Sequence, residues 1–340
     1  MSATQIPVNF TIPGDILIPG PPGKSAYELD VEGGFSGTLS EWRNSLRSGV
    51  SSPGVVNLQD FMDAHYGAGL WTKRTGVGLG SDIGPALVAA LAHIRTTWGR
   101  GKVVIPPGLW MMKTAPTAAQ YSGCMIEGFG SMASLVVYDA DSGAPFSFSG
   151  AGGYTGGGIK GVGLLLEDGH PTSTATAIRL QGDATYQPDQ MEFRDIYCSA
   201  NGNSYWYDGF HAVGTARTSP QGIRICDVRN LQIFRCRNTG IYIQNAVQWT
   251  MENIGVYAGI GSGNNFYIAG GGSASTNTTQ ISVRRLACNG DLNITNCSRF
   301  EVSGQAPTVS THSGATLGDV CIPGATPQGS FGSGVRSYFG

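Results

Sequence analysis

Charged residues are scarce in this chain, and several familiar catalytic motifs are missing. Asp, Glu, Lys and Arg make up 13% of the 340 residues, and the formal net charge is −2. So small a net charge argues against a nucleic-acid partner held through its phosphates, and a neutral glycan or another protein surface fits better. The sequence contains no GxSxG, HExxH, P-loop or dinucleotide-binding motif, and we expect neither a cofactor nor a metal site.

Long apolar runs are also missing. No stretch of about 18 apolar residues occurs, so we expect no membrane insertion. The first residues carry Pro and Gly breaks instead of a basic start and an apolar run, and we expect no signal peptide. Collagen is excluded for the whole chain because Gly does not recur at every third position, although Gly accounts for 52 residues.

The cysteines show no CxxC pair, which makes a zinc site a weak interpretation. Their number is odd, so at least one thiol stays outside any intrachain disulfide. We expect them to serve as small buried apolar residues in strands, in preference to disulfides. The seven are Cys124, Cys198, Cys226, Cys236, Cys288, Cys297 and Cys321.

Short strands with a recurring pattern fill residues 116–304. Four segments place a polar pair between two apolar residues, and a second series of alternating strands follows them. Such a repeat, with connections of variable length, predicts a β-helix and fits a propeller poorly. The first series has the anchors Phe193, Ile225, Met251 and Val283, and the second begins at Phe210, Ile241, Phe266 and Leu292. Five asparagines at turn positions favour left-handed turns and stacking: Asn230, Asn238, Asn245, Asn253 and Asn296.

Residues 51–115 have the pattern of an end cap. Residues 55–61 are predicted to form a strand and a turn. Asp82 can cap a helix that has one apolar face. A strand over 102–105 follows this helix and ends at a Pro-Pro-Gly turn. This order resembles the N-terminal cap of the pectate-lyase-like parallel β-helix family, although Ser81-Asp82-Ile83-Gly84 replaces the family's aspartate pair. The resemblance implies an all-β, right-handed parallel β-helix whose first rung is covered by a helix.

Residues 1–50 differ from the rest. Two collagen-like triplets in Ile18–Lys24 lead into Lys24–Leu29, and Ser40–Leu46 predicts a short helix. This order and spacing resemble an attachment module of bacteriophage tail fibres and tailspikes. The resemblance implies a homotrimer that binds other phage tail or baseplate proteins through residues 1–50. It also implies a place in the virion tail, after synthesis in the bacterial cytoplasm.

Four segments follow from these patterns. We expect a virion-attachment segment at 1–50, the N-terminal cap at 51–115, the parallel β-helix at 116–304, and a C-terminal cap with a Gly/Ser-rich tail at 305–340.

Carboxylates are the first candidates for chemistry, because glycan hydrolysis needs an acid and a second carboxylate at a defined separation. Asp195, Asp227 and Glu252 are expected at comparable positions of the repeat, and Asp208 is a fourth candidate catalytic residue. Outward carboxylates beside arginines are more often solvated ion pairs, which contribute little. The remaining candidates are Glu167, Asp168 and Asp291.

A run of aromatic residues is the best candidate for glycan contact. Tyr205, Trp206 and Tyr207 are consecutive, so they cannot all point into one core, and Asp208 and His211 follow them. Flat rings would lie against sugars while polar side chains bond the hydroxyl groups. Packing between subunits of a trimer is the competing interpretation, because aromatic residues are also enriched at interfaces.

Two functions remain open from the sequence. The first is a trimeric tail fibre or tailspike protein that attaches to the virion and recognises a host-surface polysaccharide or serves as an adaptor. The second is a polysaccharide depolymerase, a hydrolase or lyase, on the same scaffold. The absence of a convincing carboxylate pair favours the first.

Overall fold

A computed structural model describes most of the chain from residue 54 onward. The described ranges are 54–150, 156–182, 185–215, 222–257, 264–270, 278–306, 308–311, 318–329 and 335–339. The attachment segment expected at 1–50, and the collagen-like triplets within it, lie outside the described residues. Most of the Gly/Ser-rich tail at 329–334 lies outside them as well.

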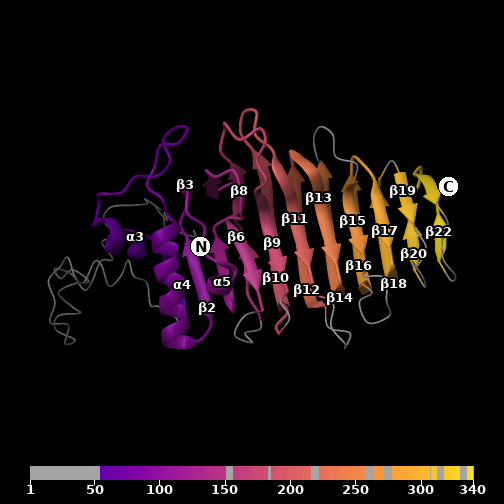
Figure 1. The fold of residues 1–340 in the computed structure, drawn as a ribbon, viewed down its shortest axis with the longest axis horizontal. Helices are drawn as coiled ribbons and strands as arrows, with labels where there is room; N and C mark the ends of the chain where they lie inside the picture. The colour runs from indigo at the N-terminus through magenta and orange to yellow at the C-terminus, as the bar shows by residue number, and fades with distance from the viewer. Residues whose placement is uncertain are drawn as a thin grey trace, which may run out of the picture. The chain divides into compact units, whose positions relative to one another are not determined.

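Two parallel sheets form a parallel β-helix, which confirms the predicted fold class (Figure 1). Within the described residues the first sheet has the order β1 (Val55–Asn57), β2 (Gly101–Ile105), β4 (Cys124–Gly128), β7 (Gly158–Lys160), β10 (Asp189–Ala200), β12 (Ile223–Phe234), β14 (Ala246–Tyr257), β16 (Thr278–Cys288), β18 (Cys297–Gln305), β20 (Asp319–Cys321) and β22 (Arg336–Tyr338), with β3 (Gly108–Met112), β5 (Ser134–Tyr138) and β8 (Gly163–Leu166) joined through β10. The second sheet has the order β21 (Thr326–Gly329), β19 (Thr308–Thr311), β17 (Leu292–Thr295), β15 (Asn264–Ala269), β13 (Cys236–Gln244), β11 (Trp206–Val213), β9 (Thr176–Gln181) and β6 (Phe146–Ser149).

Left-handed residues bend the long strands of the first sheet. Asp195, Asn230, Asn253 and Arg285 stand at the same place in successive strands and have φ values of 53° to 57°. Asn and Asp tolerate this conformation better than most residues, as the sequence predicted for the asparagines. Asn253 Nδ2 donates to Asn230 Oδ1 at 2.8 Å, and Asn230 Nδ2 donates to Asp195 Oδ1 at 2.7 Å. The bend divides each long strand into two faces, and the second sheet supplies the third.

The strand register confirms one predicted series and corrects the other. Phe210, Ile241, Phe266 and Leu292 pair in successive rungs as expected. In the first sheet, Phe193 pairs with Val228, which pairs with Met251. The anchor expected at Ile225 was therefore wrong by three residues. Ile225 itself is half exposed and has a φ of 50°, so it lies on a corner of the coil.

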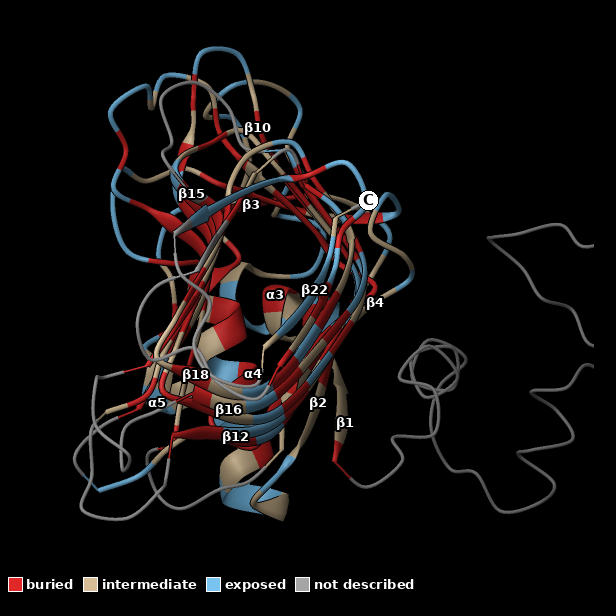
Figure 2. Ribbon diagram, turned by 90° about the vertical axis from the view of Figure 1, so that its right-hand side faces the viewer, coloured by how far each residue is buried: buried red, intermediate tan, exposed pale blue. Residues whose placement is uncertain are grey.

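The interior is a continuous apolar core (Figure 2). Inward rings from both sheets touch in series, with Phe193 and Phe210 at 5.2 Å and Phe210 and Trp249 at 6.1 Å between ring centroids. All seven cysteines are free; six are buried, as expected, whereas Cys321 is exposed. Burial raises the pKa of Cys124 and Cys288 to about 11, so these thiols remain protonated near neutral pH.

Helices cover the first rung. Helix α4 (Gly84–Trp98) buries Leu87, Leu91 and Ile94, as its apolar spacing predicted, and contacts β1 and β2. Asp82 Oδ1 accepts from the N–H of Gly84 at 2.9 Å and from that of Lys113 at 2.8 Å, so this carboxylate joins the helix start to the end of β3. The expected turn after β1 is in fact a helix, α3 (Leu58–Tyr66). A third helix, α5 (Ala118–Tyr121), packs on β6.

The solenoid continues past the boundary expected at residue 304. Strands β19 and β21 extend the second sheet, and β20 and β22 extend the first. Among the residues described here, no helix is both long and apolar enough to cross a membrane.

Candidate functional site

The outward face of the second sheet carries a column of aromatic side chains. His211 of β11 pairs in register with Tyr242 of β13, and Tyr242 pairs with Tyr267 of β15. Each residue lies between two buried residues of its strand, so its side chain points out of the solenoid. We call His211, Tyr242 and Tyr267 the aromatic ladder.

The rings of the aromatic ladder stack on one another. The centroids of His211 and Tyr242 are 4.9 Å apart with an angle of 18° between their planes, and those of Tyr242 and Tyr267 are 5.1 Å apart at 19°. The Tyr242 hydroxyl donates to Gln244 Oε1 at 3.2 Å, which holds the ring from the next outward position. The three strands are neighbours in the second sheet (Figure 1), and their stacked rings form a half-buried column that presents mainly ring rims to solvent.

A buried carboxylate fixes the first ring of the ladder. Asp208 is 2% exposed, and its Oδ2 lies 2.8 Å from His211 Nδ1. Its Oδ1 accepts from Asn238 Nδ2 at 2.9 Å and from the N–H of Thr239 at 3.2 Å. With Nδ1 bound to the carboxylate, the outward Nε2 of His211 has no hydrogen-bond partner among the described side chains and backbone groups. A carboxylate that orients a histidine in this way is also the arrangement used to hold a catalytic base.

The three consecutive aromatic residues separate as expected, but one of them was placed wrongly. Trp206 is completely buried, donates its Nε1–H to the Ser199 carbonyl at 2.6 Å, and stacks on Tyr138. It therefore belongs to the core and cannot contact a glycan, because strand alternation turns it inward. Tyr207 points outward and is 36% exposed.

The two flanking tyrosines each lie beside an arginine. The Arg235 guanidinium lies 4.9 Å from the ring centroid of Tyr205, and that of Arg237 lies 5.6 Å from Tyr207. These contacts hold the two rings near the N-terminal end of β11, and Tyr207 lies about 13 Å along that strand from His211.

The other predicted catalytic carboxylates lie on the first sheet, away from the ladder. The sequence placed them in one column, but the register separates them. Asp227 pairs with Glu192, whereas Glu252 pairs with Arg229, which in turn pairs with Arg194. Asp195 lies at the bend of its strand. Asp227 bonds Arg194 at 2.7 Å and Arg229 at 2.9 Å.

Three further candidate carboxylates are also engaged. Glu252 bonds Arg285 at 2.6 Å, and Asp195 accepts from Asn230. Glu167 is fully buried against Arg74. This supports the interpretation of these residues as ion pairs and hydrogen-bonded corners, with no free pair among them.

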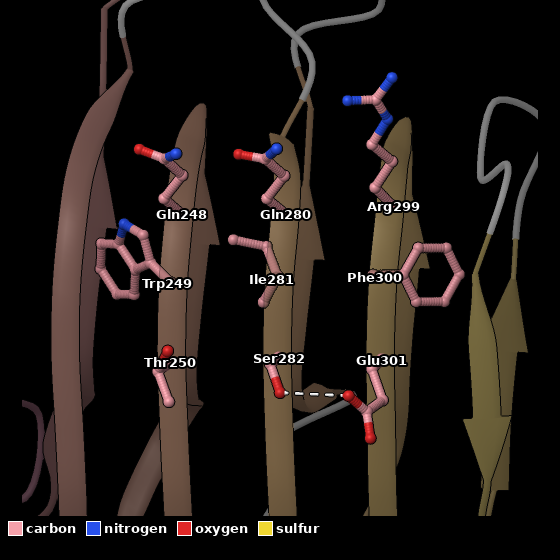
Figure 3. Close-up of a pocket in the computed structure, with 9 residues that line it drawn as sticks. All are labelled: Gln248, Trp249, Thr250, Gln280, Ile281, Ser282, Arg299, Phe300 and Glu301. Atoms are coloured by element: carbon pink, nitrogen blue, oxygen red, sulfur yellow. Dashed lines mark hydrogen bonds between the residues drawn. The ribbon is translucent and has the colours of Figure 1, made fainter.

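An open groove on the first sheet was not predicted from the sequence. It has a volume of about 490 Å³ and crosses β14, β16 and β18. Figure 3 shows Gln248, Gln280 and Arg299 in one row along it, and Ser282 beside Glu301 in another. Glu301 accepts from Ser282 at 3.5 Å and from Arg284 at 3.2 Å. The groove holds one carboxylate, so it offers no pair for hydrolysis.

No cluster of three or more His, Cys, Asp or Glu side chains suited to a metal ion occurs in the part of the chain that the structure describes. The groups that could bind a ligand are therefore hydrogen-bonding and aromatic: the ladder, the Asp208–His211 pair and the polar rows of the groove.

Solved structures share this fold at low sequence identity. The A-module of mannuronan C-5 epimerase AlgE6 of Azotobacter vinelandii has a TM-score of 0.50 and 15% identity, over 83% of this chain and 89% of that one. The ORF18 protein of Geobacillus virus E2 has a TM-score of 0.36 and 16% identity, over 89% and 65%. The Dettilon tailspike protein has a TM-score of 0.39 and 13% identity, over 83% and 67%. No protein-family model and no curated protein matches the chain. The first likeness establishes the parallel β-helix fold and leaves function to be argued from the site.

Proposed function

We propose that this chain is a subunit of a bacteriophage tail fibre or tailspike that binds a host-surface polysaccharide on the aromatic ladder. The resemblance of residues 19–46 to a phage attachment module supports the virion role, with attachment through residues 1–50 as a homotrimer. The stacked, outward rings of His211, Tyr242 and Tyr267 carry the binding role.

The ladder suits a sugar chain for two reasons. Pyranose rings present apolar C–H faces that can pack against the outward rims of the stacked rings, and their hydroxyl groups need donors and acceptors beside those rims. The ladder offers both, since Gln244 lies beside Tyr242 and Thr295 lies 3.2 Å from the Tyr267 hydroxyl. Successive rungs are about 4.8 Å apart, so the rings form a row along the solenoid axis that can follow an extended chain.

A binding assay with two matched variants tests this proposal. The full-length protein is applied to an array of bacterial surface polysaccharides, beside Tyr242→Ala and Tyr257→Ala. Tyr257 is a surface tyrosine of the first sheet that also stacks on a neighbour, Phe234, at 4.9 Å. We expect Tyr242→Ala to lose about tenfold or more in affinity, as for an aromatic hot spot, and Tyr257→Ala to bind as the wild type does.

The oligomer mass of the same variants separates glycan contact from subunit packing. If Tyr242→Ala changes the oligomeric state and leaves binding intact, the ladder is a subunit interface and the proposal is wrong.

A depolymerase is the second candidate, and the buried Asp208 behind His211 favours it. That pair could hold a proton acceptor at the ladder surface. Incubating the protein with each bound polysaccharide and following chain length by size-exclusion chromatography decides between the two. If the wild type shortens the polysaccharide chains and Asp208→Asn does not, catalysis is established. If the wild type leaves the chain length unchanged, binding remains the function.

A further inference from the structure

The second sheet carries almost no charge, and what it carries is mainly positive. Its strands contain three formally charged residues among those described: Arg179, Asp208 and Arg237. The first sheet differs, because its arginines are matched by carboxylates. The pairs there are Arg194–Asp227, Arg224–Asp189, Arg229–Asp227, Arg284–Glu301, Arg285–Glu252 and Arg336–Asp319, with Arg299 of the groove as the exception.

Arg179 continues the aromatic ladder by one rung. It pairs in register with His211, so the outward column runs Arg179, His211, Tyr242, Tyr267. Its guanidinium bonds Thr176 Oγ1 at 3.3 Å, and no carboxylate of the described residues lies within ion-pair distance. Because a guanidinium stays protonated at every physiological pH, this end of the ladder presents an uncompensated positive charge.

Arg237 gives the second positive charge. Its NH2 donates to the Thr172 carbonyl at 3.1 Å, and its guanidinium lies over the Tyr207 ring. Neither contact neutralises the charge.

Asp208 forms no ion pair with either arginine, and its single negative charge leaves the described strands of this sheet with an excess of one positive charge. Both of its oxygens are occupied by His211, Asn238 and the Thr239 N–H, and it is buried beneath the ladder surface. A ligand approaching from outside therefore meets two guanidinium groups and aromatic rings.

We propose that the polysaccharide bound by the ladder is acidic, with sugar rings packed against the outward rims of Tyr242 and Tyr267 and anionic substituents paired with Arg179 and Arg237. The planar fork of arginine matches a carboxylate or phosphate through two parallel hydrogen bonds. This inference rests on the proposed glycan binding and deepens it. The net charge of −2 pointed to a neutral glycan, but that number averages over the chain, whereas binding depends on the local distribution.

A single-stranded nucleic acid is also anionic and stacks on aromatic rings. It carries a phosphate at every nucleotide, however, whereas the described strands of the second sheet offer two arginines, Arg179 at the end of the ladder and Arg237 on β13, so the acidic glycan fits better.

The test compares each acidic polysaccharide with its carboxyl-reduced form, which keeps the rings and linkages but replaces carboxylates by alcohols. The full-length protein should bind the native uronate-containing form at least tenfold more tightly, with affinity falling as salt is raised. Arg179→Gln should lose about tenfold on the native form and bind the reduced form as the wild type does. Arg285→Gln, in an exposed pair of the first sheet, is the matched control and should not change binding. Phosphate-bearing polysaccharides keep their charge after reduction, so binding confined to them assigns phosphate as the anionic group and also supports the inference.

Three results would overturn the inference. Equal binding of the native and reduced forms of a polysaccharide whose only anionic groups are carboxylates would mean that charge is not recognised. Displacement by an oligodeoxythymidylate at comparable concentration would identify a nucleic-acid surface. Loss of binding in Arg299→Gln with Arg179→Gln unaffected would move the site to the groove. Failure to bind any polysaccharide on the array is a different outcome, because it rejects the proposed function itself.

Discussion

Removing Arg74 is expected to destabilise the solenoid strongly, because it isolates a buried carboxylate. Arg74 lies in the long connection between α3 and α4, and Glu167 follows β8. Glu167 Oε2 is 2.6 Å from Arg74 Nε, and Oε1 is 2.8 Å from its NH2. The side chains are 15% and 1% exposed, respectively. The Asp168 N–H also donates to Glu167, at 3.0 Å.

The magnitude follows from this geometry. Burial raises the pKa of Glu167, but the hydrogen bonds and charge of Arg74, with help from backbone N–H groups, outweigh it and hold the pKa below its usual value. Arg74→Met keeps the apolar stem and removes the charge. Breaking a buried pair on one side costs about 3–5 kcal/mol. The double variant Arg74→Met with Glu167→Gln leaves no unpaired buried charge, so it should recover a substantial part of the lost stability.

The pH dependence should change sign. In the wild type the depressed pKa of Glu167 contributes stability above the unfolded pKa, and this is lost as pH falls through the folded pKa. In Arg74→Met, burial acts without the arginine, so the pKa rises above the unfolded value. Stability at this site should then improve as the pH is lowered from about 8 to about 5.

Urea unfolding of the full-length protein at both pH values measures these effects. Arg285→Met is the control, because its pair with Glu252 is exposed and should contribute about 1 kcal/mol or less. The reasoning is refuted if Arg74→Met stays within about 1 kcal/mol of the wild type, or if it loses no more stability than Arg285→Met.

Three further predictions concern pH, corner residues and thiols. The ring nitrogens of His170 lie 2.8 Å from Asp141 and 3.0 Å from Asp139. Burial disfavours the charged imidazole, but the two carboxylates outweigh burial and raise the pKa of His170. His170 should therefore stabilise the fold at low pH, and this contribution should be lost as the pH rises through the raised pKa. Unfolding midpoints of wild type and His170→Gln should therefore converge as the pH rises above neutrality, and a constant gap would contradict this. Asn230→Val should destabilise by about 1–3 kcal/mol because of the positive φ, whereas Asn230→Gly should cost less; equal unfolding midpoints would contradict the strain. A thiol reagent should label Cys321 alone in the native protein and all seven cysteines after unfolding, and a second fast native thiol would contradict the burial assigned here.

The sequence was sufficient to predict a β-helix because period-two apolar patterns recur over many rungs, and the resemblance of residues 51–115 to a known N-terminal cap implied its parallel form. It misplaced one anchor at Ile225 because Val228 and Leu231 offer an equally good apolar pattern three residues later. Only the left-handed φ at Ile225 distinguishes them, and a β-branched residue is a rare occupant of that conformation. Pattern alone therefore favoured the wrong register at that point.

The ladder could have been predicted, since the correct second series already implied it. Once Phe210, Ile241 and Phe266 are aligned, the next residue of each strand is His211, Tyr242 and Tyr267. The sequence interpretation followed consecutive aromatic residues instead, and strand alternation turned one of them, Trp206, into the core. The groove had no such signal, because one of its rows, Gln248, Gln280 and Arg299, lies at left-handed corners whose conformation is set by the coil.

The outward side chains of the two sheets differ in how far they are paired within the chain. On the first sheet, outward arginines and carboxylates of neighbouring rungs neutralise one another, and Asn253, Asn230 and Asp195 bond along the corner. The paired charges of this face are satisfied by their own contacts and gain little from a ligand. On the second sheet, outward positions hold a half-buried column of stacked rings, and Arg179 has no carboxylate of the described residues to pair with. A surface that leaves aromatic area and positive charge unsatisfied has free energy to gain from a partner, and this difference between the faces is the reason to look for the ligand on the second sheet.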